Sequence, residues 1–191
     1  MGNYTVIADT SRSIIELLRA ELSPEPVSKA ETIGLAPPNE PENYTLCLNL
    51  YNIEENPGMH TAERLIVDNT TTKDPPMSLT LHYMLFANIK SDPVRKAIDE
   101  QRIMARAIQV LNDNRRVPEK YIQGTLRESQ EGVDIVNVNL NLEEKVRIWS
   151  LYNQPFKVCM FYKAGPVFIE SNNVYKATRV SEAVFKTEKV G

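Results

Sequence analysis

The chain has 191 residues, of which 42% are hydrophobic and 25% are charged, close to the average of globular proteins. This composition excludes a collagenous, coiled-coil or wholly disordered chain, and a domain of this length buries about 70% of its extended surface without disulfides or metals. The 22 basic and 25 acidic residues give a net charge of −3, so nucleic acid is not an expected partner. We expect residues 1–191 to form a single domain.

No apolar run reaches the length of a membrane-spanning helix, and residues 1–9 lack the features of a signal peptide. We therefore expect a chain that is made and folded in the cytoplasm and does not insert into a membrane. Cys47 and Cys159 lie in segments that read as strands. We interpret both as small buried hydrophobic residues rather than as a disulfide.

The first predicted element is a helix over 9–22, ended by a Ser-Pro-Glu-Pro sequence in which each proline disfavours helix at the preceding residue. Ser13 and Glu16 have the spacing of a capping box. The apolar residues that recur at helical spacing are Ile14, Leu17, Leu18 and Leu22. A short strand is expected at 31–35, before a proline-rich stretch.

Two alternating segments follow, at 44–53 and 77–89, and we predict that they form a pair of strands. In the first, Leu46, Leu48 and Leu50 share one strongly apolar face. The connection over 54–76 is much longer than an ordinary hairpin loop, which is typical of a functional or disordered loop.

The clearest predicted helix begins at Ser91-Asp92-Pro93 and runs to about 112. Its apolar residues cover more than half of the circumference, so we expect it to be covered on two sides, by the sheet and by a second element or another subunit. Asp99 has the spacing to pair with two arginines, although a solvated stripe explains the same pattern. Glu100 and Gln101 fall inside the apolar arc, where they contact either another subunit or a nearby backbone. The polar stripe consists of Arg95, Asp99, Arg102, Arg106, Gln109 and Asp113.

The last third predicts a half-buried strand over 133–140, a short helix over 142–152 and a β-rich segment over 156–171 that is broken at Gly165-Pro166. Residues 172–191 are expected to form an edge strand or an arm that orders on a partner. Together these elements predict an α+β (or α/β) domain, with a mixed β-sheet and two or three packed helices.

Sequence motifs for catalysis are missing. The seven glycines never have a dinucleotide-binding or P-loop spacing, and no Gly-x-Ser-x-Gly or Cys-x-x-Cys occurs. The two histidines, His60 and His82, are more typical of surface or half-buried side chains than of ligands or catalytic bases. We therefore expect no catalytic residues, no cofactor and no metal.

Several segments resemble, in order along the chain, the tail-cap or tail-terminator proteins of phage-tail-like contractile injection systems of the antifeeding-prophage and virulence-cassette types. The resemblance extends over about residues 3–171. The segments that carry it are IIELLR at 14–19, LNLYNIEENP at 48–57, PPMSL at 75–79, YML at 83–85, DEQR at 99–102, AIQVL at 107–111, IWS at 148–150 and PVFIES at 166–171.

This resemblance implies a structural protein that forms a hexameric ring on the distal end of the tube and sheath, stops polymerisation and latches the sheath. Its implied partners are copies of itself, the inner tube protein and the sheath protein. A terminator is also expected to offer a sheet edge to sheath arms, which we place in 156–171 or 174–185. Another tail component, such as a connector or adaptor, is the first alternative, and a small hydrolase or ligand-binding module is the second.

We expect the contacts between subunits to involve the polar stripe of the long helix and two aromatic residues, for which core packing is the alternative. The candidate interface residues are Arg95, Asp99, Glu100, Gln101, Arg102, Arg106, Tyr51 and Trp149.

Overall fold

The computed structural model describes residues 4–57, 63–68, 70–90, 93–129 and 132–176. Its centre is a five-stranded mixed sheet in which only the first two strands are parallel. The strands, in their order across the sheet, are β1 (Ile33–Leu35), β2 (Leu46–Glu55), β5 (Met77–Ala87), β7 (Cys159–Ile169) and β6 (Asp134–Val138). The fold class predicted from the sequence is confirmed, as is the pairing of β2 with β5.

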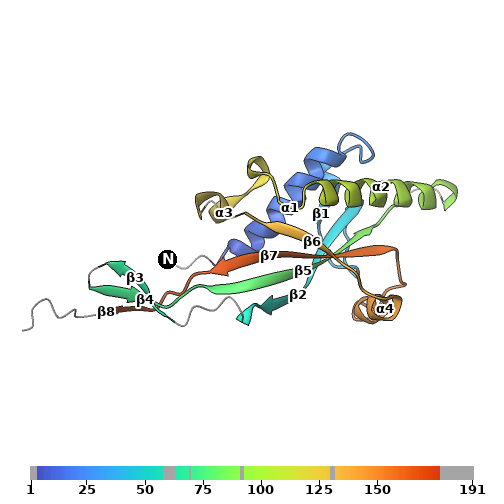
Figure 1. The fold of residues 1–191 in the computed structure, drawn as a ribbon. Coiled ribbons are helices and arrows are strands. Elements are labelled where there is room, and N and C mark those ends of the chain that lie inside the picture. The colour runs from blue at the N-terminus through green and yellow to red at the C-terminus, as the bar shows by residue number, and fades with distance from the viewer. Residues whose placement is uncertain (1–3, 58–62, 69, 91–92, 130–131, 177–191) are drawn as a thin grey trace, which may run out of the picture.

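Helices cover both faces of this sheet, but unequally (Figure 1). On one face lie α1 (Val6–Leu22), α2 (Pro93–Asp113) and α3 (Gly124–Ser129), with the short 3₁₀ turns η1 (Ala30–Thr32) and η3 (Glu119–Tyr121). On the other face α4 (Leu142–Ser150) covers only one end of the sheet. None of the helices in the described part of the chain is both long and apolar enough to cross a bilayer.

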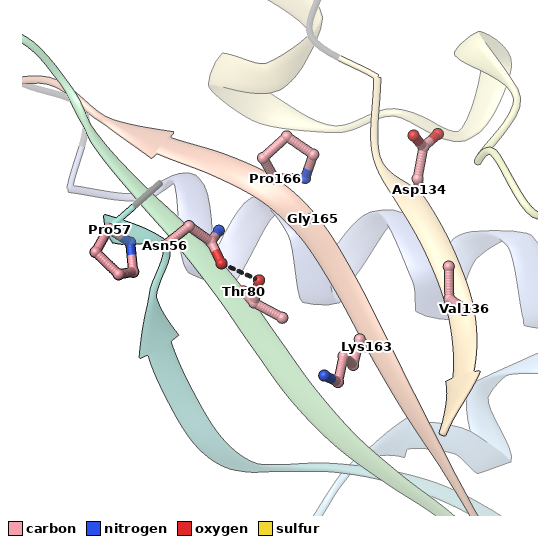
Figure 2. A pocket seen from close by; sticks show the side chains of 8 residues that line it. All are labelled: Asn56, Pro57, Thr80, Asp134, Val136, Lys163, Gly165 and Pro166. Carbon is pink, nitrogen blue, oxygen red and sulfur yellow. Dashed lines mark hydrogen bonds between the residues drawn. The ribbon is translucent and has the colours of Figure 1, made fainter. Parts of the chain in front are cut away.

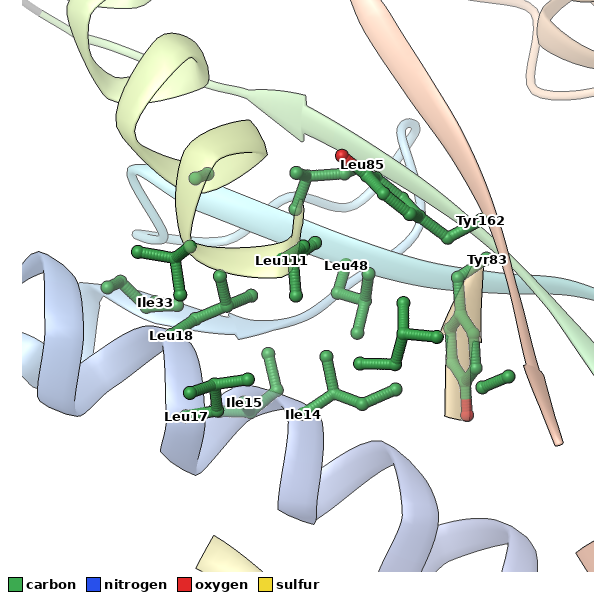
Figure 3. Packing of buried hydrophobic residues seen from close by; sticks show 14 of the residues in the cluster. Ile14, Ile15, Leu17, Leu18, Ile33, Leu48, Tyr83, Leu85, Leu111 and Tyr162 are labelled. Atoms are coloured by element: carbon green, nitrogen blue, oxygen red, sulfur yellow. The ribbon is translucent and has the colours of Figure 1, made fainter. Parts of the chain in front are cut away.

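The main core lies between α1, α2 and the sheet (Figure 3). The stripe of α1 that contains Ile14, Leu17 and Leu18 is buried against Leu48 and against Leu111 of α2. Burying each such side chain stabilises the fold by roughly 1.5–3 kcal/mol, which explains why the spacing of these residues identified the helix. Helix α1 is confirmed and begins three residues earlier than predicted.

A second, smaller core lies under α4 and contains Cys47, Met84, Phe86, Phe161 and Trp149. Because the sheet is covered on both faces here, β2 has two apolar faces, and the expectation of a single apolar face was incomplete. Both cysteines are buried, as expected. Each pairs with Phe86 from a neighbouring strand, so about 10 Å, two strand spacings, separates them, beyond the roughly 7 Å limit for a disulfide. Burial raises the pKa of Cys47 to about 12 and that of Cys159 to about 11.

The predicted capping box at Ser13 and Glu16 is wrong, because Ser13 lies inside α1 and donates to the carbonyl of Asp9 at 2.7 Å. The buried carboxylate of Asp9 instead joins the first turn of α1 to α3. It accepts hydrogen bonds from the backbone N–H of Thr125 (3.1 Å), the Thr125 hydroxyl (2.7 Å) and the Thr5 hydroxyl (2.8 Å). Gly124, with φ of 55°, allows this approach, since a Cβ there would lie 2.4 Å from the carboxyl carbon.

We predict that Asp9→Asn removes part of the dependence of stability on pH. Burial raises the pKa of Asp9, but the hydrogen bonds from Thr125 and Thr5 outweigh burial and leave the pKa below its ordinary value of 3.8. A carboxylate with a lowered folded-state pKa stabilises the protein above its unfolded-state pKa, and this contribution is lost as the pH falls through the folded-state pKa. The variant should lose about 1.5–3 kcal/mol at pH 7 and less at pH 3, as measured by urea unfolding. An equal loss at both pH values would contradict this assignment.

The segment 54–76, expected to be a loop, contains a hairpin. Strands β3 (Leu65–Asp68) and β4 (Thr71–Lys73) pair with each other, and β4 also pairs with β8 (Val174–Lys176). We call these three strands the outlying sheet, because they lie away from the helices at one end of the molecule (Figure 1). Strand β8 is thus an edge of the outlying sheet, and the rest of the segment 172–191 predicted as an edge strand or a partner-ordered arm, residues 177–191, lies outside the described residues, as do 58–62.

Strand β7 corrects two further expectations. It is not broken at Gly165-Pro166 but continues through it with a shift of register, where Gly165 adopts a φ of 155° against the carbonyl of Leu79. It also lies between β5 and β6, so the accepting sheet edge cannot be in the main part of 156–171.

Candidate assembly surfaces

The outlying sheet exposes several aliphatic side chains. Leu65, Ile66 and Val67 of β3 and Val174 of β8 are all exposed, with Ile66 at 64%. Leu65 and Val174 each pair with Lys73, which places them in one row on one face. A sheet of strands this short normally needs a helix or a second sheet to be stable. Its exposed aliphatic residues are therefore a candidate contact surface.

The opposite face of the outlying sheet carries the exposed Ile66 and a cluster of polar side chains that contact one another. Asn173 Nδ2 and Tyr175 Oη donate to Asp74 at 3.1 and 3.0 Å, and the Arg64 guanidinium lies 3.3 Å from the same carboxylate and over the Tyr175 ring. The hydrogen bond from Asn173 is the largest of several contacts that hold the pKa of Asp74 below its ordinary value. These contacts fix β8 to the hairpin and so hold Leu65 and Val174 on either side of Lys73, which pairs with Glu170 at 2.8 Å.

A second apolar surface lies at the end of the molecule where α4 is found (Figure 1). Its most exposed residues are Leu151 at 78% and Val158 at 73%. Helix α4 begins with a capping box between Asn141 and Glu144, which the sequence reading missed although the Asn-x-x-Glu spacing signals it. The other exposed apolar residues of this surface are Leu142, Val146 and Phe156.

Helix α2 is covered on two sides only in its second half. Ile103, Met104 and Ala107 are buried, whereas Ile98 is exposed. Of the two interpretations of the Asp99 spacing, the solvated stripe fits the structure, because within the described residues no arginine lies within ion-pair distance of its carboxylate. Arg95 on the same stripe is exposed.

The polar residues of α2 line two shallow grooves, one on each side of the helix. Asp99 and Arg102 line one of about 310 Å³ together with Glu25. Glu100 and Gln101 line the other, of about 210 Å³, together with Lys157 and Val158. Half of the predicted interface residues therefore line the two grooves beside α2. Among the described residues, none of these four side chains has an ion-pair partner.

Three predicted interface residues have internal roles. Arg106 bonds the backbone carbonyl of Glu21 at 3.3 Å and lies 3.8 Å from its carboxylate, so it joins α2 to α1. Trp149 is 2% exposed, donates from Nε1 to the carbonyl of Pro155 at 2.8 Å and packs edge-on against Phe86. Tyr51 is half-buried beside the same core. Core packing, the alternative considered for both aromatic residues, describes their positions.

The face of the sheet beyond α4 is open and holds a groove of about 540 Å³ (Figure 2). Thr80 donates to Asn56 at 2.9 Å across its floor, and Lys163 and Val136 line its other side, opposite the face that carries α1. His82, expected near the surface, is in fact only 6% exposed. Its Nε2 lies 2.9 Å from a carboxylate oxygen of Glu54.

Within the described residues, no three or more His, Cys, Asp or Glu side chains are grouped as metal ligands. The features that distinguish this molecule are its uncovered apolar surfaces, its open sheet face and the grooves beside α2.

Comparisons with known proteins identify a family and two solved structures of similar fold. The family model described as the Pvc16 N-terminal domain matches residues 9–183. The fold is similar to the cryo-EM structure of the PVC sheath/tube terminator of an extracellular contractile injection system in its extended state, with a TM-score of 0.68 and 19% identity, over 97% of this chain and 64% of that one. It is also similar to the tube-terminating cap of the anti-feeding prophage, with a TM-score of 0.61 and 17% identity, over 94% of this chain and 61% of that one. The chain thus spans less than two thirds of either structure. No curated protein sequence matches it.

Proposed function

The chain belongs to the Pvc16 N-terminal domain family, and from this membership we propose that it is a structural cap, or terminator, of a contractile injection system. It would form a ring on the distal end of the tube and sheath, stop their polymerisation and latch the sheath. The family expected from the sequence is confirmed by the family model. Support for the role comes from two solved structures of the same fold, both of which are terminators by their descriptions.

The observation that carries this proposal is the pair of uncovered apolar surfaces at two ends of one chain. The outlying sheet lies at one end of the molecule and the α4 surface at the other (Figure 1). Monomeric soluble proteins rarely expose contiguous apolar patches unless these bind another molecule. Two different patches on one subunit allow head-to-tail contacts, which close into a ring when the rotation between subunits permits.

The proposed partners are other copies of the chain in a hexameric ring, the inner tube protein and the sheath protein. Contacts would involve polar residues of α2, namely Arg95, Asp99, Glu100, Gln101 and Arg102, of which all but Arg95 line the two grooves beside α2. We propose that the protein is not an enzyme, and that it assembles in the cytoplasm without nucleic acid or membrane insertion.

Electron microscopy of particles assembled with and without this protein tests the proposal. Particles that lack it should show a broad distribution of tube lengths or prematurely contracted sheaths, and no distal ring. Asp99→Lys should shift the length distribution in the same direction without lowering the melting temperature, because Asp99 is partly exposed and has no ion pair to lose. Normal particles with a normal distal end would contradict the cap function, and labelling at the baseplate end would indicate another tail component.

A further inference from the structure

A basic groove lies between η3 and α3, apart from the surfaces described above. It has a volume of about 620 Å³. Its floor is formed by the buried side chains of Val117, Ile122 and Leu126. Its rim carries Arg116, Lys120 and Arg127, and Glu119 is the one acidic residue among those that line it.

The two arginines of this rim are poorly neutralised within the chain. Arg116 lies 4.0 Å from Asp134, and both side chains are largely exposed. An exposed pair at this distance contributes little to stability. In the part of the chain that the structure describes, Arg127 has no carboxylate within ion-pair distance. Among the described residues, Arg127 on the α3 side of the groove thus has no ion-pair partner, and Arg116 has only the exposed carboxylate of Asp134.

A matching excess of negative charge lies in residues 23–43, which we call the acidic segment. It contains four glutamates and one lysine. The glutamates are Glu25, Glu31, Glu40 and Glu42, all of them exposed and, among the described residues, without an ion-pair partner.

The fold gathers these four glutamates at one end of the sheet. Strands β1 and β2 are parallel, so the residues that precede them, among them Glu31 and Glu42, lie at the same end. The backbone N–H of Thr45 donates to the carbonyl of Thr32 at 2.7 Å, and Glu25 lines the same groove as Thr45. The acidic segment thus carries more acidic than basic side chains, although Lys90 donates to the carbonyl of Glu42 at 2.8 Å and Arg102 lines the same groove as Glu25.

The α3 side of the basic groove and the acidic segment lie at different ends of α1, whereas the η3 side of the groove lies beside Glu21, at the end of α1 where the acidic segment begins. Helix α3 is held at the first turn of α1 through Asp9, whereas the acidic segment begins directly after Leu22 at its last turn. The 17 residues of α1 extend about 25 Å. At that separation water and salt screen most of the attraction within one subunit. Lys120 lies near Glu21, because its neighbour Tyr121 donates to that carboxylate at 3.0 Å. The test below therefore substitutes the other two basic residues of the rim, Arg116 and Arg127.

From this arrangement we propose that the basic groove of one copy of the chain receives the acidic segment of a second copy. The contact deepens the proposed ring and rests on it, because two different surfaces on each subunit form a head-to-tail interface. Complementary charge fixes which surfaces meet and speeds their encounter. The chain carries a net charge of −3, so it repels a phosphate polymer overall. This favours the acidic segment of a second copy as the occupant of the groove.

Sedimentation velocity of the chain alone, at 50 and 500 mM NaCl, tests this contact. Self-association should be at least ten-fold weaker at the higher salt. Arg116→Glu/Arg127→Glu and Glu40→Lys/Glu42→Lys should each weaken association at 50 mM NaCl at least ten-fold. The variant that combines all four substitutions should return to within about three-fold of the original protein, because its opposite charges again face each other.

The matched control combines Arg116→Glu/Arg127→Glu with Glu54→Lys/Glu55→Lys, two exposed acidic residues of β2 that lie outside the acidic segment and outside both apolar surfaces. It restores the net charge in the same way and should not restore association. A monomeric original protein, unchanged association in either double variant, or equal rescue by the control would overturn the proposal. If Arg116→Glu/Arg127→Glu loses binding to a single-stranded DNA while its self-association is unchanged, the groove is an anion site instead.

Tube termination is scored separately in particles that carry the same variants. If the double variants lose self-association and still terminate tubes at the normal length, this contact is wrong for the ring while the cap function stands. If the original protein does not terminate tubes although charge governs its association, the cap function is wrong and the contact between copies stands.

Discussion

Leu65→Lys/Val174→Lys should abolish capping while leaving the monomer folded. Both residues are exposed and share one face of the outlying sheet, so lysine there costs the isolated subunit less than about 0.5 kcal/mol each. If this face is buried against a neighbour in the particle, the same lysines leave charges without partners in an apolar contact. Such a loss is typically several kcal/mol per interface, which corresponds to a decrease in occupancy of 100-fold or more.

The measurement combines thermal unfolding of the variant with electron microscopy of particles that contain it. The matched control is Leu65→Ile/Val174→Ile, which keeps both side chains apolar and should cap normally. Tubes of normal length with the lysine variant would show that the outlying sheet takes no part in capping. A melting temperature lowered by many degrees would show instead that these residues stabilise the subunit itself.

Trp149→Ala should be the most destabilising single substitution in the smaller core. Trp149 is 2% exposed, its indole N–H donates to Pro155 at 2.8 Å, and its ring packs edge-on against Phe86 and Phe156 at 5.4 and 5.9 Å. Truncating a buried tryptophan to alanine costs about 3–5 kcal/mol, since it removes apolar burial and leaves a cavity. For a domain of this size, this cost lowers the melting temperature by roughly 6–20 °C.

Circular dichroism should be used for this measurement, because Trp149 is the only tryptophan and the variant has no indole fluorescence. Leu151→Ala is the matched control: it lies just beyond the same helix, is 78% exposed and should change the free energy of unfolding by less than about 0.5 kcal/mol. Equal losses in both variants would mean that α4 is not packed on the sheet as the structure shows.

The order of the helices and strands along the chain could be predicted from the sequence more readily than the pairing of strands in space. Helices α1 and α4 and strands β2 and β5 were identified from local periodicity, because their spacing of apolar residues reflects one buried face. The family resemblance was identified from the same segments. The capping box of α1 was misread, since short-range spacing permits such a contact without requiring it.

The candidate surfaces depended on contacts between distant residues. The outlying sheet joins residues 65–73 to 174–176, and the bond between Asp74 and Asn173 spans 99 residues. The junction of Asp9 with Thr125 spans 116. A local sequence pattern does not show which distant residue a side chain will contact. A strand of three residues also has too few alternating positions to indicate the strand that pairs with it.

By itself, the sequence determined the class of fold and the order of its main elements, because both depend on the local alternation of apolar and polar residues, and it indicated the family through the ordered resemblance of several segments. The tertiary structure alone decided which strands are edges, which apolar residues remain uncovered and which charges lack partners. Those properties depend on what lies beside each residue in space, and here the neighbours come from distant parts of the chain.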